Sequence, residues 1–258
     1  MSFIRTNKED RLLENLESAD FFEAETLAVV WETKQEIVER LLPPPLEPFE
    51  RPLARAYVCN FPRTNFNVSY KETALMIFCQ YKGEVGVYVL AMHVDNDMAM
   101  AYGREIFGYP KKMAEIGLKR GKIGASGWGK RHGSKVVEMK SNAMKRITEE
   151  EAIELQLGAD ESQNTVFLFK HFPAHDVNGF DYQPRLLREP VTFSRKSIHI
   201  GHGKVSLGQS KFDPWGEVEV VKMLVATYTI GNQSMLKCDV LAEAETEAFQ
   251  PYSYLKWD

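Results

Sequence analysis

Two adjacent lysines, Lys111 and Lys112, stand where the sequence favours chemistry over a solvated surface. They follow Pro110, which ends an apolar helical segment and fixes the direction of the backbone. A lysine amine attacks a carbonyl carbon only in its neutral form, whereas an exposed lysine is almost entirely protonated at pH 7. The sequence therefore predicts an imine-forming amine here, provided that the fold removes it from water.

The elements on either side of the pair are expected to hold it still. Apolar residues at mostly helical spacing predict a helix over residues 98–107, with Asp95 or Asp97 as its N-cap. A glycine and a proline end that helix, and a strand over residues 113–118 follows. Lys111 is thus placed at a helix-to-strand junction.

The residues around the lysine pair belong to a longer pattern. It reads Tyr70-Lys71-Glu72, Asp95-Asn96, Gly103-Arg104-Glu105 and Tyr109-Pro110-Lys111-Lys112. This pattern resembles the signature of the acetoacetate decarboxylase family, in which the first lysine forms an imine with a keto acid. The resemblance implies that catalytic role for Lys111 and the role of its cationic neighbour for Lys112.

Strand periodicity by itself favours Lys112, and not Lys111, as the buried lysine. In a regular strand from Lys111 onward, Lys112 shares a face with Ile116 and Leu118, while Lys111 shares a face with Glu115. Periodicity alone would bury Lys112. The family resemblance points to Lys111 instead, which requires either an irregular strand after the proline or a strand that is buried on both faces.

Glu72 is the second candidate catalytic residue. In a predicted strand over residues 68–81, alternation places it on an apolar face together with Met76, which we expect to line the substrate cavity. A buried carboxylate there acts either as a proton donor beside the imine or as a structural partner of Arg104 or a lysine. The resemblance, which places a catalytic glutamate here, favours the first interpretation.

The chain departs from the family pattern at two positions. Tyr57 stands where the family has a second catalytic glutamate, and Ala24 stands where the family has the arginine that meets the substrate carboxylate. Arg55 shares a face with Tyr57 by alternation and is a candidate replacement for that arginine, although most such arginines are exposed. The resemblance also places Tyr109 in the cavity. The predicted substrate-binding residues are therefore Tyr109, Tyr57, Arg55 and Met76.

Strands joined by short turns dominate the predicted secondary structure, so the fold class is mainly β (α+β) with a few peripheral helices. Such a pattern is typical of an antiparallel sandwich or barrel. The resemblance implies a cone-shaped closed barrel with the lysine inside, in a single domain over residues 1–258. The predicted strands include residues 26–31, 53–61, 68–81, 86–94, 135–140, 165–172, 191–199, 204–207 and 218–230.

Composition limits the possible partners. A formal net charge of -4 and a pI near 5.9 argue against a nucleic-acid or anionic-membrane partner. No apolar run is long enough for a membrane span or a secretory signal, which predicts a cytoplasmic protein. Cys59, Cys79 and Cys238 are widely spaced, and they suggest neither a zinc site nor a catalytic dyad. We expect no metal or cofactor, a small keto-acid substrate and a homo-oligomer.

Three functions remain open at this point. The first is a lyase that decarboxylates a β-keto acid through an imine on Lys111, with Glu72 handling the proton. The second is a pyruvate-dependent aldolase-dehydratase that uses the same imine. The third is a non-catalytic barrel that binds an apolar carboxylic acid with a charged Lys111 as counter-ion.

Overall fold

The computed structural model describes residues 3–4, 6–7, 17–154 and 165–256. Most of the described chain is strand, as the sequence predicts. The strands are β1 (Ala19–Glu32), β2 (Glu47–Pro48), β3 (Leu53–Phe61), β4 (Arg63–Thr64), β5 (Tyr70–Tyr81), β6 (Glu84–Val94), β7 (Lys111–Met113), β8 (Glu115–Arg120), β9 (Ala125–Arg131), β10 (Ser134–Ile147), β11 (Thr165–Lys170), β12 (Arg185–Leu207), β13 (Lys222–Met235) and β14 (Asp239–Glu243).

The helices are short and lie around the sheet. They are α1 (Gln35–Leu41), α2 (Asp97–Tyr102), the π-helix η3 (Gly103–Phe107), α3 (Glu149–Glu154), the 3-10 helix η5 (Trp215–Glu217), α4 (Thr246–Phe249) and the 3-10 helix η6 (Gln250–Lys256). None of the helices in the described residues is long and apolar enough to cross a membrane.

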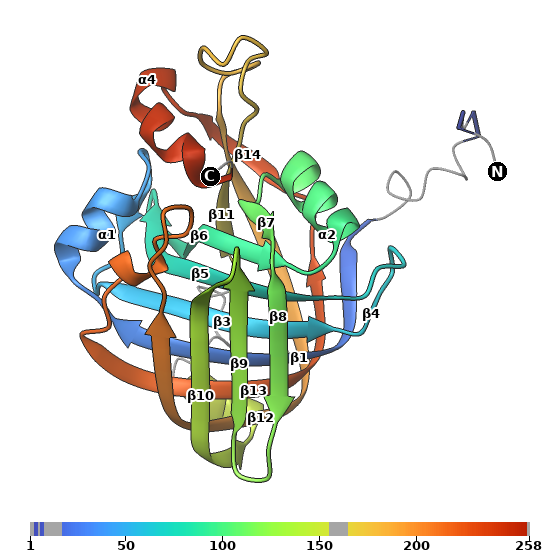
Figure 1. Cartoon of the computed structure of the whole chain (residues 1–258), viewed down its shortest axis with the longest axis vertical. Coiled ribbons are helices and arrows are strands. Elements are labelled where there is room, and N and C mark those ends of the chain that lie inside the picture. Colours follow the sequence, from blue (N-terminus) through green and yellow to red (C-terminus); the bar gives the residue numbers. More distant parts are fainter. Residues whose placement is uncertain (1–2, 5, 8–16, 155–164, 257–258) are drawn as a thin grey trace.

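One sheet contains all 14 strands of the described residues, and ten of them follow the order β11-β6-β5-β3-β1-β13-β12-β10-β9-β8. The other four lie off this path: β14 pairs with β12, β2 with β5, β4 with β1 and β7 with β6. Strand β11 also pairs with the first residues of β12, so the hydrogen-bonded path from β11 through β13 returns to its start. In Figure 1, β1, β3, β5 and β6 run across the molecule, and β8, β9 and β10 cross in front of them. The long strand β12 connects these two parts of the sheet.

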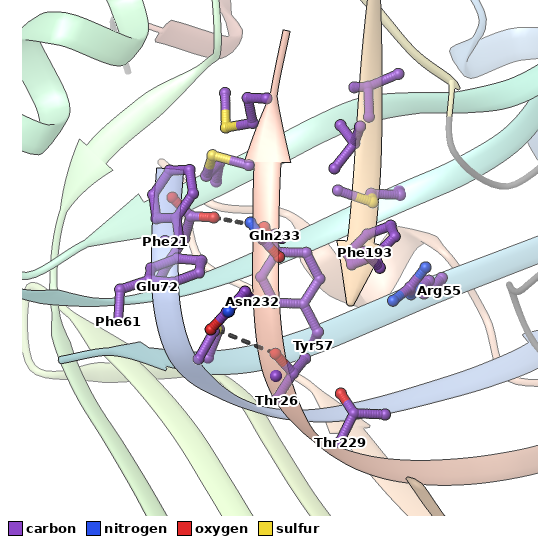
Figure 2. Close-up of a pocket in the computed structure, with 18 of the residues that line it drawn as sticks. Phe21, Thr26, Arg55, Tyr57, Phe61, Glu72, Phe193, Thr229, Asn232 and Gln233 are labelled. Atoms are coloured by element: carbon purple, nitrogen blue, oxygen red, sulfur yellow. Dashed lines mark hydrogen bonds between the residues drawn. The ribbon is translucent and has the colours of Figure 1, made fainter. Parts of the chain in front are cut away.

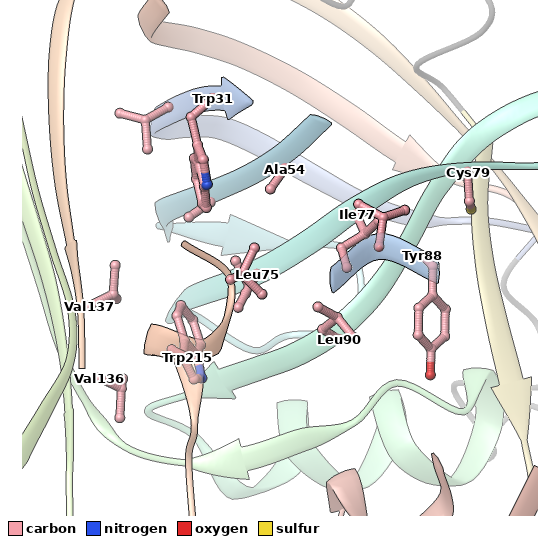
Figure 3. Packing of buried hydrophobic residues seen from close by; sticks show 14 of the residues in the cluster. Trp31, Ala54, Leu75, Ile77, Cys79, Tyr88, Leu90, Val136, Val137 and Trp215 are labelled. Carbon is pink, nitrogen blue, oxygen red and sulfur yellow. The ribbon is translucent and has the colours of Figure 1, made fainter. Parts of the chain in front are cut away.

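Strand β5 is buried on both faces, which determines where the cavity and the core lie. Leu75 and Ile77 point into a core cluster that also contains Val136, Val137 and Trp215 (Figure 3). The alternate residues of β5 point to the opposite face and join a second apolar cluster. Because both faces exclude water, a polar side chain on either face of this wall must find a partner inside the protein.

The junction before Lys111 differs in detail from its prediction. The side chain of Asn96, and not of Asp95 or Asp97, caps α2 by accepting from the Ala99 amide at 3.0 Å. The first residue after η3 is Gly108, which has a φ of 88° and so adopts a left-handed conformation that favours glycine.

The predicted strand over residues 113–118 is in fact two strands. Strand β7 lies beside β6 in parallel and begins at Lys111 itself, whereas β8 pairs with β9. Between them, the Ala114 amide donates to the Val94 carbonyl at 2.9 Å. Downstream, the two strands predicted over residues 191–207 are one continuous strand, and β13 begins only at Lys222 because η5 precedes it.

Candidate active site

The Lys111 amine is buried at the wall of a cavity. Only 5% of the residue is exposed, and Nζ lies 2.8 Å from Oε2 of Glu72. The rings of Tyr70 and Tyr109 face the same nitrogen, with centroids 5.1 and 5.5 Å away. Gly103 packs so tightly against this side chain that a Cβ atom there would lie 2.5 Å from Cδ of Lys111. The amine therefore has a fixed position.

Lys112 points to the other face of β7. Its amine donates to the Phe212 carbonyl at 2.9 Å and lies 3.4 Å from Oδ1 of Asp213. His93 and Arg131 contact the same carboxylate, at 3.0 and 2.9 Å. We call these four residues, Asp213, His93, Lys112 and Arg131, the Asp213 cluster. Lys112 is therefore buried, as periodicity suggested, but it does not line the cavity that Lys111 reaches.

Electrostatics in the Asp213 cluster favour a permanent ion pair. Burial acts to raise the pKa of Asp213, but hydrogen bonds from His93 and Arg131 outweigh it and hold that pKa well below its usual range. The His93 ring stacks on Trp215 with centroids 5.3 Å apart, and burial lowers the pKa of His93. The cluster joins β6, β7 and β9 to the segment before η5.

Glu72 is held from two sides. Tyr57 donates a short hydrogen bond to Oε1, while Lys111 approaches Oε2. Only 4% of Glu72 is exposed. Burial raises the pKa of Tyr57 well above its ordinary value, and the charge of Glu72 raises it further, so the phenol stays a donor. The sequence-predicted residues Lys111, Glu72 and Tyr57 thus form one chain of contacts, in which Glu72 accepts a hydrogen bond from Tyr57 and forms an ion pair with Lys111.

An inner cavity of about 120 Å³ extends from this chain along the sheet. Figure 2 shows Glu72, Tyr57 and Arg55 around it, and the predicted residues Met76 and Tyr109 also line it. Ala24 lines the same cavity, so the small residue at the family's arginine position leaves space there. All four predicted substrate-binding residues therefore reach this cavity.

A second, outer cavity of about 370 Å³ meets the inner one at Lys111. Its walls come from α2, η3 and the end of β13, and they include Phe66, Tyr102 and Phe107. Lys111 and Tyr70 line both cavities. Ile106, at the edge of the outer cavity, is 41% exposed. The amine can thus be approached from two sides.

Sequence reasoning missed Glu189, a third carboxyl near Lys111. It is fully buried, and Tyr109 donates a short hydrogen bond to its Oε2. Burial raises the pKa of Glu189 to about 8, although Tyr109 and the charge of Lys111 act to lower it. Its alternation with the buried residues Leu187 and Val191 was the available signal, because it is the pattern that identified Glu72.

Arg55 lies at the far end of the inner cavity and is only partly exposed. Its Nε atom is buried and has no hydrogen-bond partner. Burial lowers the pKa of Arg55, and the neighbouring charge of Arg195 lowers it further. The described residues contain no group of three or more histidine, cysteine, aspartate or glutamate side chains that could hold a metal ion.

The fold and the site define a mainly β protein with a buried amine–carboxylate pair at a cavity wall. The profile of the family described as "Acetoacetate decarboxylase (ADC)" matches residues 4–244. The chain therefore belongs to the acetoacetate decarboxylase family.

Individual relatives agree with this assignment. Acetoacetate decarboxylase 3 of Mesorhizobium japonicum is 37% identical over 94 residues, which cover 36% of each chain. Among solved structures, acetoacetate decarboxylase from Legionella pneumophila has a TM-score of 0.78 at 22% identity, covering 88% of both chains. The enduracididine biosynthesis enzyme MppR, complexed with pyruvate, has a TM-score of 0.71 at 19% identity and covers 88% of this chain and 91% of its own.

Proposed function

We propose that this chain is a Schiff-base-forming lyase that decarboxylates a small β-keto acid at Lys111. The observation that carries the proposal is the buried Lys111 amine 2.8 Å from the Glu72 carboxylate at the wall of a cavity. Membership of the acetoacetate decarboxylase family supports it. An imine accepts the electrons of the departing carboxylate by itself, so the proposed reaction needs only this chain's side chains.

The first step is a proton transfer within the ion pair. Transfer of the proton from the Lys111 ammonium to the Glu72 carboxylate would give a neutral pair beside the apolar cavity wall. The neutral amine then adds to the ketone carbon, and loss of water gives the protonated imine. The Glu72 carboxylate lies 2.8 Å from the Lys111 amine and can therefore take the ammonium proton without moving.

The second step breaks the bond between the α-carbon and the carboxylate. Its electrons move into the protonated imine, carbon dioxide leaves, and an enamine remains on Lys111. Apolar walls such as Phe21 and Met92 disfavour the charged carboxylate relative to neutral carbon dioxide. Glu72, which returned its first proton to the departing water when the imine formed, takes up a second proton from solvent and delivers it to the enamine carbon; hydrolysis of the imine then releases the ketone.

Two further groups support these proton transfers. Tyr57 stabilises the Glu72 carboxylate by a hydrogen bond and thereby sets how readily Glu72 takes the proton. Glu189 acts as a positioning residue, because its carboxyl fixes Tyr109, whose ring packs over Lys111. Lys112 has no direct part in this mechanism.

A pyruvate-dependent aldolase-dehydratase is the second candidate function. The outer cavity, which meets the inner one at Lys111, gives room for an aldehyde beside an imine formed from pyruvate. The replacement of the family's second glutamate by Tyr57 also favours it. The structural similarity to MppR, solved with pyruvate, supports the same alternative at the level of the fold.

Two assays on the purified full chain separate these functions. The proposed lyase releases carbon dioxide from β-keto acids, whereas an aldolase-dehydratase produces enone absorbance from pyruvate and an aldehyde. Borohydride reduction in the presence of either acid should leave a secondary-amine adduct on the protein, whose added mass is that of the acid, or of its decarboxylated product, less one oxygen atom. Acid binding without turnover and without a borohydride adduct would contradict both enzymes and leave the binding barrel.

The proposed architecture is the closed, cone-shaped barrel of the family in a single domain. The pairing of β11 with both β6 and β12 supports a closed ring of strands. A homo-oligomer in solution remains part of the proposal, and sedimentation velocity tests it.

A further inference from the structure

The outer cavity has an apolar wall, although it ends at the reactive amine. Three aromatic rings form one side of it: the centroids of Phe21 and Phe66 lie 5.6 Å apart, and those of Phe66 and Tyr102 lie 6.2 Å apart. Both pairs meet edge to face. Further apolar residues of the wall are Ala19, Phe107, Met235 and Leu236. Water in such a cavity has few hydrogen-bond partners, so an apolar ligand group displaces it favourably.

The charged side chains at the outer cavity are already paired. Among the described residues that line it, the charged ones besides Lys111 are Glu17 and Lys237. These two pair with each other at 2.8 Å, and their side chains are 90% and 70% exposed. Lys111 pairs with Glu72 at 2.8 Å. The Glu17–Lys237 pair therefore belongs to the mouth of the cavity, and the space between the mouth and Lys111 suits a neutral, apolar group.

The inner cavity is smaller and more polar. The polar side chains that line it include Tyr57, Glu72, Arg55 and Asn232. A cavity of about 150 Å³ holds benzene, which has six heavy atoms. The inner cavity, at about 120 Å³, accordingly accommodates about five heavy atoms. The carboxymethyl arm of a β-keto acid has four heavy atoms, so this arm by itself nearly fills the inner cavity.

The other substituent of the ketone carbon must then point to the outer cavity. In the imine this carbon is bonded to the Lys111 nitrogen, and Lys111 and Tyr70 line both cavities. The outer cavity, at about 370 Å³, is more than twice the size of the cavity that holds benzene. A methyl group, which is the substituent in acetoacetate, leaves most of this space unfilled. The outer cavity therefore has room for a much larger substituent directly beside the reacting carbon.

We propose that the substrate is a β-keto acid whose ketone carbon carries an apolar substituent about the size of a hexyl group, bound in the outer cavity. This inference rests on the proposed imine chemistry at Lys111. Burial of the substituent against Phe21, Phe66 and Tyr102 supplies binding energy, while the carboxymethyl arm lies in the inner cavity. Ile106, at the edge of the outer cavity, is 41% exposed, so the substituent can enter from solvent.

Three β-keto acids test this proposal: acetoacetate, which carries a methyl group, 3-oxohexanoate, which carries a propyl group, and 3-oxononanoate, which carries a hexyl group. Each methylene group buried in the outer cavity should raise kcat/KM about fourfold. We therefore expect a value about 10-fold higher for 3-oxohexanoate than for acetoacetate, and at least about 100-fold higher for 3-oxononanoate. Equal values for the three acids, or a preference for acetoacetate, would overturn the proposal.

A variant that fills the outer cavity links the preference to this site. Ala19 is partly buried and packs beside the aromatic rings of the wall, so A19F adds a ring there. We expect A19F to lower the ratio of kcat/KM for 3-oxononanoate to that for acetoacetate by at least about 10-fold. A174F, the same change at a partly buried loop alanine that lines neither cavity, should leave the ratio unchanged. Equal ratios in the two variants would contradict binding in the outer cavity. The chain-length series on the wild type tests the proposal even if A19F does not fold.

Ligands that cannot react separate this inference from the proposed function. Nonanoate and butanoate have a carboxylate but no ketone, and calorimetric titration measures their binding to the full chain directly. If no keto acid gives a borohydride adduct while nonanoate binds the wild type at least about tenfold more tightly than both butanoate binds it and nonanoate binds A19F, the lyase proposal fails and the apolar site stands. If adducts form but nonanoate and butanoate bind equally, the apolar site fails alone.

Discussion

Lys111 and Lys112 are neighbours in the chain, but their amines belong to two different charge clusters on opposite faces of β7. Around Lys112, the single carboxylate of Asp213 is shared by three nitrogen-bearing side chains at 2.9 to 3.4 Å. Around Lys111, a single carboxylate oxygen lies 2.8 Å from the amine, and the other neighbours are the rings of Tyr70 and Tyr109.

We propose that this difference separates a structural ion cluster, around Asp213, from a reactive ion pair, Lys111 with Glu72. A carboxylate that stabilises three donors at once is difficult to protonate, so the Asp213 cluster keeps its charges. A single lysine–glutamate pair in an apolar site can become neutral by moving one proton between its partners. The two faces of one short strand therefore give chemically identical side chains different surroundings.

Replacing each of the two lysines in turn tests the difference between them most directly. We expect K111M to lower kcat/KM for keto-acid turnover by at least about 1000-fold, because no other lysine in the described part of the chain lines the inner cavity. K112M, the matched control, should lose at most about tenfold. Steady-state kinetics measures both, and equal losses in the two variants would contradict the division between the faces.

The Asp213 cluster should dominate stability. D213N leaves Lys112 and Arg131 without their shared carboxylate, and we expect the free energy of unfolding to fall by about 3–5 kcal/mol. Urea denaturation measures the change, and D181N, at an exposed loop aspartate, is the control. A loss as small as that of D181N would show that the cluster is not structural.

Glu189 should make stability depend on pH. Its pKa is about 8 in the folded chain, against an ordinary value of 4.5. Between these values the folded chain binds more protons than the unfolded chain, so the free energy of unfolding falls as the pH rises from about 4.5 to 8. The total decrease from this group is a few kcal/mol.

The variant E189Q should flatten this slope. E50Q, which changes an exposed glutamate, should keep it. Urea denaturation at a series of pH values between 5 and 8 gives the slopes. Parallel curves for the wild type and E189Q would mean that Glu189 does not hold its proton in the folded chain.

The hydroxyl of Tyr57 should have the smallest effect. Y57F removes one hydrogen bond to the Glu72 carboxylate, which corresponds to a loss of about 10- to 100-fold in kcat/KM for a charged acceptor. Because the ring remains, the stability should change little. Y254F, at an exposed tyrosine, is the control. An unchanged pH–rate profile in Y57F would argue against its role in proton transfer.

The sequence predicted the site better where the signal is local. Glu72 and Tyr57 reach the cavity because strand alternation holds over β3 and β5, and both strands were predicted almost to their ends. The partner of Lys112 could not be predicted, because Asp213 is 101 residues away on a segment without regular periodicity. Asn96 replaced the predicted aspartate cap because three neighbouring residues there all have capping side chains.

The two-sided burial of β7 was the part that required the structure. Periodicity correctly assigned Lys112 to a buried face, and the family pattern correctly brought Lys111 to the cavity. Both predictions are correct because the outer strands β8 to β10 and the core around Trp215 cover the face of β7 opposite the cavity. The alternation of side chains along one strand cannot show which layers will pack on each of its faces.

Locating the borohydride adduct tests the central claim most directly. The wild-type chain is reduced in the presence of a β-keto acid, digested, and the peptide that contains both lysines is fragmented in a tandem mass spectrometer. We expect the added mass on Lys111 and none on Lys112. An adduct on Lys112, or no adduct on either residue while carbon dioxide is still released, would contradict imine chemistry at Lys111.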